Sequence, residues 1–317
     1  MRYLVTGVAG FIGSHLAEEL LKQGHQLIGI DCFTDFYPRG IKEQNLANLK
    51  GKAGFEFIEA SINQIELKPI LSRVDGIFHL SAQAGVRTSW GKDFDHYLEH
   101  NIKATQRILE AMRDFPELKM VFASTSSVYG DTDQYPTPES ALKRPFSPYG
   151  ATKLACEGLC YLYYKNYGVK VTTLRYFTVF GPRQRPDMAF HIFIKAVLTG
   201  KRINVYGDGS QTRDFTYVKD IVAGTISAME KGKIAEAYNL GGGHQNKLID
   251  TIDLIFKLCG KNTEINFLPP VKGDVKETLA DTTKARSELG YSPKGSVEQG
   301  LKEEIAWIKQ IIPCSSD

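Results

Sequence analysis

A glycine-rich turn constrains the fold more than any other feature of this sequence. Gly7, Gly10 and Gly13 recur at every third position between an apolar run at residues 2–6 and a helical pattern at residues 12–23. This arrangement predicts a strand, a tight turn and a helix in succession. A helix N-terminus presents unpaired N–H groups and a partial positive charge, and glycines let a ligand approach the backbone closely. The turn therefore predicts a site for a pyrophosphate group.

An acidic residue follows where a bound dinucleotide would need one. Asp31 comes directly after the next predicted strand, residues 26–30. A carboxylate there accepts hydrogen bonds from the adenosine ribose and would repel the 2′-phosphate of NADP. The glycine spacing is G-x-x-G-x-x-G rather than G-x-G-x-x-G, and packing glycines with a turn-capping aspartate are the alternative interpretation. Together the turn and Asp31 indicate a site for NAD.

Strand and helix patterns alternate through the first half of the chain. Further strand candidates are residues 55–59, 75–80, 119–124, 169–175 and 237–243, and helix candidates are residues 93–114, 148–167, 188–199, 248–259 and 297–311. We therefore expect an α/β fold, a Rossmann-type doubly wound parallel sheet with a smaller mixed α/β substrate-binding lobe. The expected domains are discontinuous: residues 1–176 plus 215–240 bind NAD, and residues 177–214 plus 241–317 bind the substrate.

Composition and spacing exclude several partners. The 317 residues include 39 Lys and Arg against 36 Asp and Glu, a balance too even for a nucleic-acid-binding surface. No apolar run reaches about 18 residues, so we expect no membrane span, no signal peptide and a cytoplasmic location. His96 and His100 lack a zincin glutamate and are interpreted as helix-surface residues, so no metal is expected. The cysteines are odd in number without CxxC and are expected as reduced thiols: Cys32, Cys156, Cys160, Cys259 and Cys314.

Tyr149 and Lys153 form the candidate catalytic pair. They are four residues apart in SPYGATK at the predicted start of helix 148–167, and side chains at that spacing share a helix face. A lysine ammonium beside a phenol favours the phenolate, which would let tyrosine act as a base near neutral pH. The Ser/Thr run 124–127 ends a predicted strand, where ligands of doubly wound sheets bind. The alternatives are a surface pair and hydroxyl groups that satisfy their own turn.

Five segments resemble the extended short-chain dehydrogenase/reductase family, specifically its nucleotide-sugar epimerases: TGVAGFIGSH, HLSAQAGVRTSW, STSSVYG, SPYGATK and RYFTVFGPRQRPDMAF. The similarity spans nearly the whole chain, and residues 175–190 most resemble UDP-glucuronate 4-epimerases. It implies a retained NAD and a catalytic triad of Thr125, Tyr149 and Lys153. It also implies that Tyr149 takes the 4-hydroxyl proton while hydride moves from C4 to NAD, that the 4-keto sugar turns over, and that hydride returns to the opposite face.

The resemblance also implies which residues bind the ligands. Those at the cofactor are Gly7, Gly10, Phe11, Ile12, Gly13, Asp31, Leu80, Ser81, Ala82, Tyr149 and Lys153. Those at the UDP-sugar are Arg87, Ser89, Ser126, Ser127, Thr178, Arg185, Met188, Ala189, Phe190, Gln211, Arg213 and Asp274, with Asp187 beside the same channel. Ser61 stands where family members usually carry an aspartate that contacts adenine, so a different adenine contact is expected.

The chain lacks the additional acid or base of related activities. Sugar 4,6-dehydratases carry Asp-Glu where this chain has Ser126 and Ser127, and UDP-glucuronate decarboxylases usually carry Glu at the second position. The simplest remaining reaction is C4 epimerisation, with UDP-glucuronate and UDP-galacturonate favoured. The alternatives are a UDP-glucose/UDP-galactose 4-epimerase, a UDP-glucuronate decarboxylase and, from another class, a non-catalytic NAD-binding sensor, which would have no need of the triad.

Four arginines suit the charge of a UDP-sugar acid, because guanidinium groups bind carboxylates and phosphates at two points. They are expected in loops near the site, at least one of them as a rim ion pair: Arg87, Arg183, Arg185 and Arg213. By resemblance, Arg185 and Thr178 hold the sugar carboxylate and Arg213 holds the diphosphate. Oxidation at C4 makes a uronic acid prone to lose CO₂, so the carboxylate must be kept out of alignment with the new carbonyl. The resemblance also implies a homodimer through the helices at 93–114 and 148–167.

Overall fold

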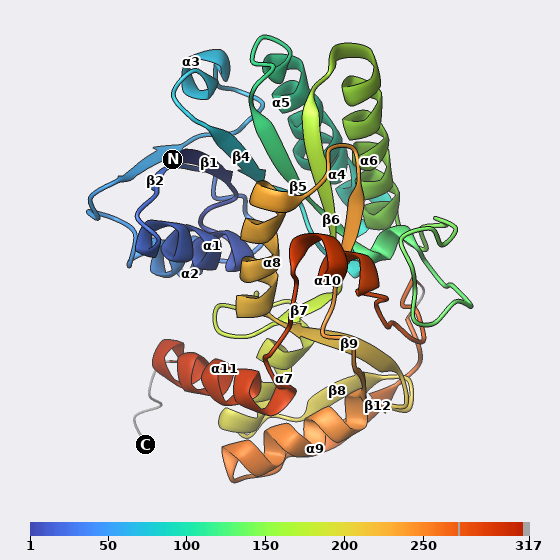
Figure 1. Cartoon of the computed structure of the whole chain (residues 1–317). Helices are drawn as coiled ribbons and strands as arrows, with labels where there is room; N and C mark the ends of the chain where they lie inside the picture. Colours follow the sequence, from blue (N-terminus) through green and yellow to red (C-terminus); the bar gives the residue numbers. More distant parts are fainter. Residues whose placement is uncertain (272, 313–317) are drawn as a thin grey trace.

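A seven-stranded parallel sheet forms the centre of the protein, which a computed structural model describes over residues 1–271 and 273–312. Its strands in spatial order are β10 (Ala237–Leu240), β6 (Lys170–Tyr176), β5 (Lys119–Thr125), β4 (Gly76–His79), β1 (Arg2–Thr6), β2 (Gln26–Asp31) and β3 (Phe55–Glu59). Every neighbouring pair runs parallel. The chain order reverses between β4 and β1, which opens a crevice at their carboxyl ends. The predicted doubly wound sheet is confirmed (Figure 1).

Helices cover both faces of this sheet, because successive strand residues point to opposite sides. Val5 shares one hydrophobic core with α1 and α8, whereas its neighbour Leu4 shares a second core with α3, α5 and α6. These helices are α1 (Phe11–Lys22), α3 (Lys68–Leu71), α5 (Ala104–Met112), α6 (Pro148–Tyr167) and α8 (Val218–Lys231), with α2 (Arg39–Leu46) beside α1. Cys156 and Cys160 are buried thiols of the second core, as expected; Cys314 lies outside the described residues.

A smaller lobe adjoins the end of β6 and carries the later elements (Figure 1). Its strands are β7 (Thr178–Phe180), β9 (Thr212–Tyr217) and β11 (Gln245–Lys247) in one sheet, and β8 (Ile203–Tyr206) and β12 (Ile265–Leu268) in another. Its helices are α7 (Ala189–Leu198), α9 (Leu248–Cys259), α10 (Thr283–Leu289) and α11 (Val297–Ile311). Among the described residues, no helix combines the length and apolar character needed to cross a bilayer.

The helix predicted at residues 93–114 is interrupted. α4 (Phe94–Tyr97) runs into a π-helical turn over Leu98–Lys103 before α5 begins. The side chain of Asn101 holds this turn: it makes hydrogen bonds of 2.8 and 3.1 Å with the Gln83 backbone and one of 3.0 Å with Thr152. A π turn departs from the α-helical repeat, so the side chains before it are rotated relative to a continuous helix.

Helix α8 has no counterpart among the predicted elements. Its sequence contains Gly224 and several β-branched residues, which weaken a helical pattern. In the structure Gly224 permits close packing, since a Cβ there would lie 2.8 Å from Leu240 Cδ1. The domain division stays a prediction. β9 crosses its boundary after residue 214, and α10 packs against α8 and β10 of the larger sheet.

Candidate active site

The glycine turn is built for a close ligand. Gly7 has a φ of +70°, and a Cβ there would lie 2.8 Å from the Ser81 backbone nitrogen. A Cβ on Gly13 would lie 2.2 Å from the Gly7 carbonyl oxygen, closer than real Cβ contacts come. Gly10 is the N-cap of α1 and no side chain caps it, so the first N–H groups of the helix remain for an anion.

Asp31 serves the turn as well as the cleft beside it. Its carboxylate accepts hydrogen bonds from the Ala9 backbone N–H at 3.0 Å and the Phe33 N–H at 2.9 Å. Burial raises the pKa of Asp31, and the hydrogen bonds and the charge of Lys42 oppose that rise. Asn45 of α2 donates to the Ala9 carbonyl at 2.9 Å, so the turn is held from both sides. The turn-capping role of this aspartate and a ligand-binding role therefore coexist in one side chain.

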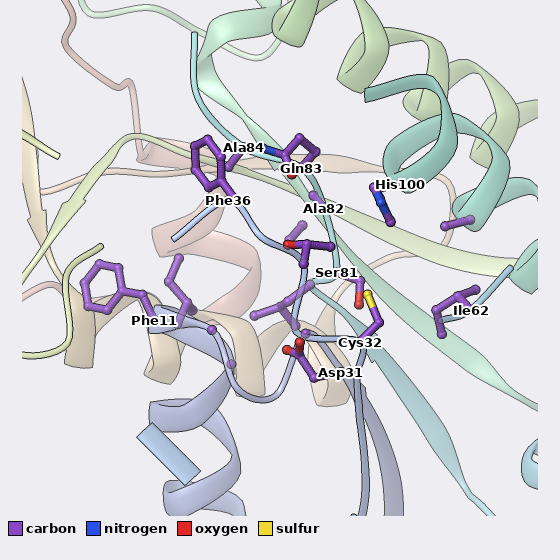
Figure 2. Close-up of a pocket in the computed structure, with 18 of the residues that line it drawn as sticks. Phe11, Asp31, Cys32, Phe36, Ile62, Ser81, Ala82, Gln83, Ala84 and His100 are labelled. Carbon is purple, nitrogen blue, oxygen red and sulfur yellow. The ribbon is translucent and has the colours of Figure 1, made fainter. Parts of the chain in front are cut away.

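A single cleft brings together all eleven residues that the resemblance assigns to the cofactor. It encloses about 1150 Å³, including the solvent at its mouth, where ligand pockets usually measure about 300–1,000 Å³. Figure 2 shows Asp31, Ser81 and Ala82 at its centre, Phe11 toward one end, and Ile62 and His100 toward the other. Ser61 also lines it and accepts a hydrogen bond from the Asn63 N–H at 3.2 Å.

The residues of this cleft that were not predicted as site residues include Thr34, Phe36, Tyr37, Lys42, Ile62, Gln83, His100 and Tyr176. Lys42 lies on α2, a helix that was not predicted, and donates to the Thr34 carbonyl at 2.6 Å. The interpretation of His100 as a helix-surface residue is wrong. His100 lies on the π-helical turn, where the altered repeat directs a half-buried side chain to the cleft, while His96 is exposed. No sequence signal for that turn was recognised.

Tyr149 and Lys153 both line the cleft from the first turns of α6. Ser147 caps this helix by accepting the Gly150 N–H at 3.2 Å, and Pro148 begins it. Lys153 Nζ donates to the Ala123 carbonyl at 2.8 Å, and burial lowers the pKa of Lys153. The lysine is thereby fixed against the carboxyl end of β5.

The pKa of Tyr149 is raised in this structure, which differs from the sequence-based expectation. Burial is the largest cause, and the charge of Arg185 and a hydrogen bond with Thr125 oppose it. The cation that most opposes this rise in the pKa of Tyr149 is Arg185, from the loop before α7. Thr125 itself accepts the Ser127 N–H and donates to the Ser127 hydroxyl, both at 3.2 Å. Thr125 is thus within hydrogen-bond reach of Tyr149, and Arg185 adds positive charge from a separate loop.

The four arginines have different surroundings. Arg185 lines the cleft with Tyr149, and its guanidinium binds the Asp187 carboxylate at two points. Arg183 turns away to α1, where it binds Glu18 at 2.7 Å, and is thus an ion pair of the scaffold. The expectation that all four lie in loops is wrong for Arg213, which is on β9, and for Arg87, which begins a 3-10 helical turn over Arg87–Ser89.

A second hollow lies in the smaller lobe. Gln211, Arg213 and Asp274, the residues assigned to the uridine and diphosphate, line it together. Arg87 reaches its edge, where it pairs with Asp274 at 2.7 Å and stacks 4.4 Å from the Tyr206 ring centroid. This ion pair joins segments 187 residues apart in sequence. Burial lowers the pKa of Arg213, and the charge of Asp274 opposes that effect.

Other residues assigned to the sugar have structural partners. Ser89 is buried and its hydroxyl donates to the Val86 carbonyl at 2.7 Å. Phe190 packs in the lobe core, 4.4 Å between ring centroids from Phe215. Within residues 1–271 and 273–312, the linings of these two hollows do not include the following members of the predicted set: Ser89, Ser126, Ser127, Thr178, Met188, Ala189 and Phe190. Their ligand contacts stay predictions.

These features fit a dinucleotide. Side chains larger than hydrogen do not fit at Gly7 or Gly13. The N-terminus of α1 has no side-chain cap, and Asp31 lies at the end of β2. Within the described part of the chain, no three His, Cys, Asp or Glu side chains are grouped to hold a metal ion.

Known proteins are similar along the whole chain. A sequence model described as GDP-mannose 4,6 dehydratase matches residues 4–304. A UDP-glucuronate 4-epimerase of Thermodesulfobacterium geofontis is 41% identical, covering 98% of this chain and 97% of that protein. An uncharacterised UDP-glucose epimerase of Bacillus subtilis is 45% identical, covering 98% and 99%. The crystal structure of a UDP-glucuronic acid 4-epimerase from Bacillus cereus, in complex with UDP-glucuronic acid and NAD, superposes with a TM-score of 0.96 at 46% identity, covering 98% and 100%.

Proposed function

The chain belongs to the extended short-chain dehydrogenase/reductase family, among its NAD-dependent nucleotide-sugar epimerases, and on this premise we propose that it interconverts UDP-glucuronate and UDP-galacturonate at C4. One observation carries the choice of a uronic acid. The cleft that contains the catalytic tyrosine also contains Arg185, a fixed cation whose charge acts on that phenol. A neutral hexose offers this guanidinium no charged partner, whereas a sugar carboxylate does.

The residues of the larger cleft suit NAD as the retained cofactor. We infer that the uncapped N–H groups of Phe11, Ile12 and Gly13 hold its pyrophosphate and that Asp31 accepts hydrogen bonds from its adenosine ribose. When bound, NAD supplies a hydride acceptor for C4 and the positive charge of its oxidised nicotinamide ring. Lys42 and His100 are further candidates for contacts at the adenosine end.

Tyr149 acts as the base and acid of the reaction. Its phenolate accepts the proton of the sugar 4-hydroxyl and later returns it to the 4-oxygen of the product. Thr125 stabilises the phenolate when its hydroxyl hydrogen turns from Ser127 to the phenol oxygen, and Arg185 stabilises it by charge, while burial opposes ionisation. Lys153, anchored to the Ala123 carbonyl, adds a positively charged donor to the same wall of the cleft.

The absence of an acid beside Thr125 favours epimerisation over related reactions. Ser126 and Ser127 have hydroxyls where dehydratases of this family carry Asp-Glu, so the name of the matching family does not describe the activity proposed here. Oxidation at C4 turns a uronic acid into a β-keto acid, which loses CO₂ when its carboxylate aligns with the carbonyl π system. We infer that Arg185, together with Thr178, holds the carboxylate away from that alignment.

The second hollow suits the UDP moiety. Arg213 offers positive charge to the diphosphate, and Gln211 and Asp274 lie in the same lining. Arg87, although half-exposed, is pre-positioned at the rim by Asp274. We infer that these four residues recognise the nucleotide: Gln211, Arg213 and Asp274 from the smaller lobe, and Arg87 from the segment after β4.

A homodimer in the cytoplasm is the expected setting. α5 and α6 pack side by side, and α6 leaves Tyr161 and Leu162 exposed at 55% and 41% of their surface. Large apolar side chains exposed together on a helix suit a protein interface. A second copy of this chain, joined through α5 and α6, would cover them.

A substrate panel tests the proposed activity. The purified protein is incubated separately with UDP-glucuronate and UDP-glucose, and the products are resolved by chromatography. We expect UDP-galacturonate from UDP-glucuronate, without net consumption of NAD. The B. subtilis relative named as a UDP-glucose epimerase makes UDP-glucose the second candidate. Conversion of UDP-glucose alone would refute the proposal that the substrate is a uronic acid. UDP-pentose as the main product would indicate a decarboxylase. Absence of turnover with either sugar would favour the NAD-binding sensor.

A further inference from the structure

Asp187 controls the orientation of the arginine in the cleft. Arg185 Nε donates to Asp187 Oδ1 at 3.0 Å, and Arg185 Nη2 donates to Oδ2 at 2.9 Å. Two parallel hydrogen bonds between charged groups fix the plane of a guanidinium as well as its position. The pair is sheltered, since the two side chains are 21% and 32% exposed. The Phe36 ring, 5.7 Å from the guanidinium carbon, flanks the arginine.

This pairing leaves a defined part of the guanidinium available. Arg has five N–H donors, and Asp187 takes one from Nε and one from Nη2. Both hydrogens of Nη1 and the second hydrogen of Nη2 have no partner among the described residues. These hydrogens form the outer fork of the guanidinium. The fork can donate two parallel hydrogen bonds to a second carboxylate. The ion pair with Asp187 therefore selects which edge of Arg185 faces an incoming anion.

The backbone before Arg185 is held separately. The Gly181 N–H donates to the buried Glu304 carboxyl at 2.9 Å, and His15 Nε2 donates to the Pro182 carbonyl at 2.8 Å. Arg183 keeps a left-handed φ of +68° and is tied to Glu18 of α1 at 2.7 Å. The chain before Arg185 is thereby anchored without help from Arg185 itself, whose guanidinium is hydrogen-bonded to Asp187 alone among the described residues. Asp187 is the residue that immobilises it.

We propose that Asp187 is a positioning residue that sets uronic-acid specificity, by holding Arg185 with its outer fork directed to the sugar carboxylate. This inference rests on the proposed function. A free arginine loses rotamer freedom when it binds an anion, and an arginine that is already fixed loses less. The same constraint fixes the direction of the bound carboxylate. Asp187 thus favours UDP-glucuronate over UDP-glucose and also opposes decarboxylation.

The test compares Asp187→Asn with a matched control in the NAD-loaded protein. Asn keeps the shape of Asp but removes the charge and one acceptor oxygen. Glu264→Gln removes a carboxylate from an exposed ion pair with Arg202 elsewhere in the same lobe. Dissociation constants for UDP-glucuronate and UDP-glucose are measured by calorimetry, and the UDP-pentose fraction is measured during turnover. Arg185→Ala defines the largest effect, and Asp187→Glu tests rescue by a conservative carboxylate.

The expected result is selective. Asp187→Asn raises the dissociation constant for UDP-glucuronate about tenfold, the scale of one charge-assisted hydrogen bond. The dissociation constant for UDP-glucose changes by no more than about twofold. Asp187→Asn also raises the pentose fraction, while Asp187→Glu recovers part of both effects and Glu264→Gln resembles the wild type. Equal weakening of both sugars would overturn the inference in favour of a merely structural loop contact. Tighter binding of UDP-glucuronate would mean that Asp187 competes with the substrate, and unchanged constants would also overturn it.

The two hypotheses fail in different ways. If the wild type does not convert UDP-glucuronate, the proposed function fails before any variant is compared. If the wild type makes UDP-galacturonate and Asp187→Asn keeps its affinity ratio and product ratio, only the role of Asp187 fails.

Discussion

The phenol of Tyr149 lies between two opposing influences, burial and the positive charge of Arg185. Burial is the larger influence, so the pKa of Tyr149 is raised above its ordinary value. A base of this kind ionises readily only when further positive charge enters the site. The oxidised nicotinamide ring of NAD carries such a charge. At the residue scale, cofactor binding and activation of the base are therefore linked by electrostatics.

Tyr149→Phe removes the hydroxyl and keeps the aromatic packing, including the edge contact with Tyr97 at 6.2 Å between ring centroids. We expect kcat to fall about 10³-fold, within the range for loss of a general acid–base group. Binding of NAD is expected to persist, and it is checked by retention of the cofactor through gel filtration. Undiminished turnover in Tyr149→Phe would show that another group moves the proton.

Gly13 offers a second prediction at this scale. Gly13→Ala would force a Cβ to within 2.2 Å of the Gly7 carbonyl oxygen, so the pyrophosphate turn must shift. We expect loss of NAD binding and a free energy of unfolding lower by about 3 kcal/mol, the upper range for overpacking. Gly40→Ala on α2, where a Cβ meets nothing within 4 Å, is the matched control and should retain NAD. Calorimetry of both variants decides, and an NAD-binding Gly13→Ala would contradict the close approach.

How much of the site the sequence predicted depends on how local each residue's surroundings are. Gly7, Gly13 and Asp31 were predictable because one turn and two strand ends bring them together. Lys153 lines the cleft with Tyr149, as their spacing indicated, but the spacing gave no sign that Arg185 would bring its charge to the same phenol from a loop after β7. Which charged side chain faces a phenol across a cleft depends on tertiary packing. A spacing of four residues carries no information about that packing.

At the scale of elements, the predictions followed the strength of the repeating pattern. The central strands and α6 lie where their apolar runs and periodicity indicated. Helix α8 was missed, because Gly224 and β-branched residues weaken its propensity while tertiary packing stabilises it. The π-helical turn over residues 98–103 was missed because Asn101 holds it through partners on two other segments. Both omissions arise from contacts distant in sequence.

The contact between α1 and the loop before α7 gives a prediction about pH. Burial, followed by the charge of Arg183, lowers the pKa of His15 from 6.5 to about 4. Above pH 6.5 His15 is neutral in the folded and unfolded states alike. As the pH falls toward 4, the unfolded chain takes up a proton that the folded protein refuses, so His15 reduces the free energy of unfolding. The reduction is about 1.4 kcal/mol per pH unit and about 3 kcal/mol in total.

His15→Gln keeps a donor for the Pro182 carbonyl and removes the titration. We expect its free energy of unfolding, measured by chemical denaturation, to fall less than that of the wild type between pH 6.5 and 4. His96→Gln, which changes an exposed imidazole, serves as the control and should follow the wild-type curve. Parallel curves for His15→Gln and the wild type would exclude the buried histidine as a source of acid sensitivity.

At the scale of the whole molecule, one hydrophobic core runs from the large sheet into the smaller lobe. It includes Val5 and Leu174 of the sheet, Phe180 and Phe215 of the lobe, and Ile305 of α11. The domain division stays a prediction, and it follows the excursion of the chain after β6 and its return to the large sheet at β10. It could not capture a shared core, because sequence boundaries do not show which side chains pack across them. The two lobes are therefore expected to unfold together.

The exposed side chains of α6 give the prediction at this scale. Tyr161→Glu with Leu162→Glu places two charges on the face proposed to bind a second copy. We expect the mass measured by light scattering to fall from that of a dimer to that of a monomer, with the fold retained by circular dichroism. Ile192→Glu on α7, also an exposed apolar residue, is the control and should stay dimeric. A monomeric wild type would remove the proposed interface altogether.

The ion pair between Arg87 and Asp274 has a consequence for how the chain is made. Ribosomes synthesise a protein from its N-terminus to its C-terminus, so the glycine turn, Asp31 and the central strands are made early. The partner of Arg87 emerges 187 residues later. Most residues of the cofactor cleft are thus synthesised well before the last residues of the nucleotide hollow. All residues that line the cofactor cleft, up to Arg185, have therefore been synthesised before Asp274, which lies in the lining of the nucleotide hollow.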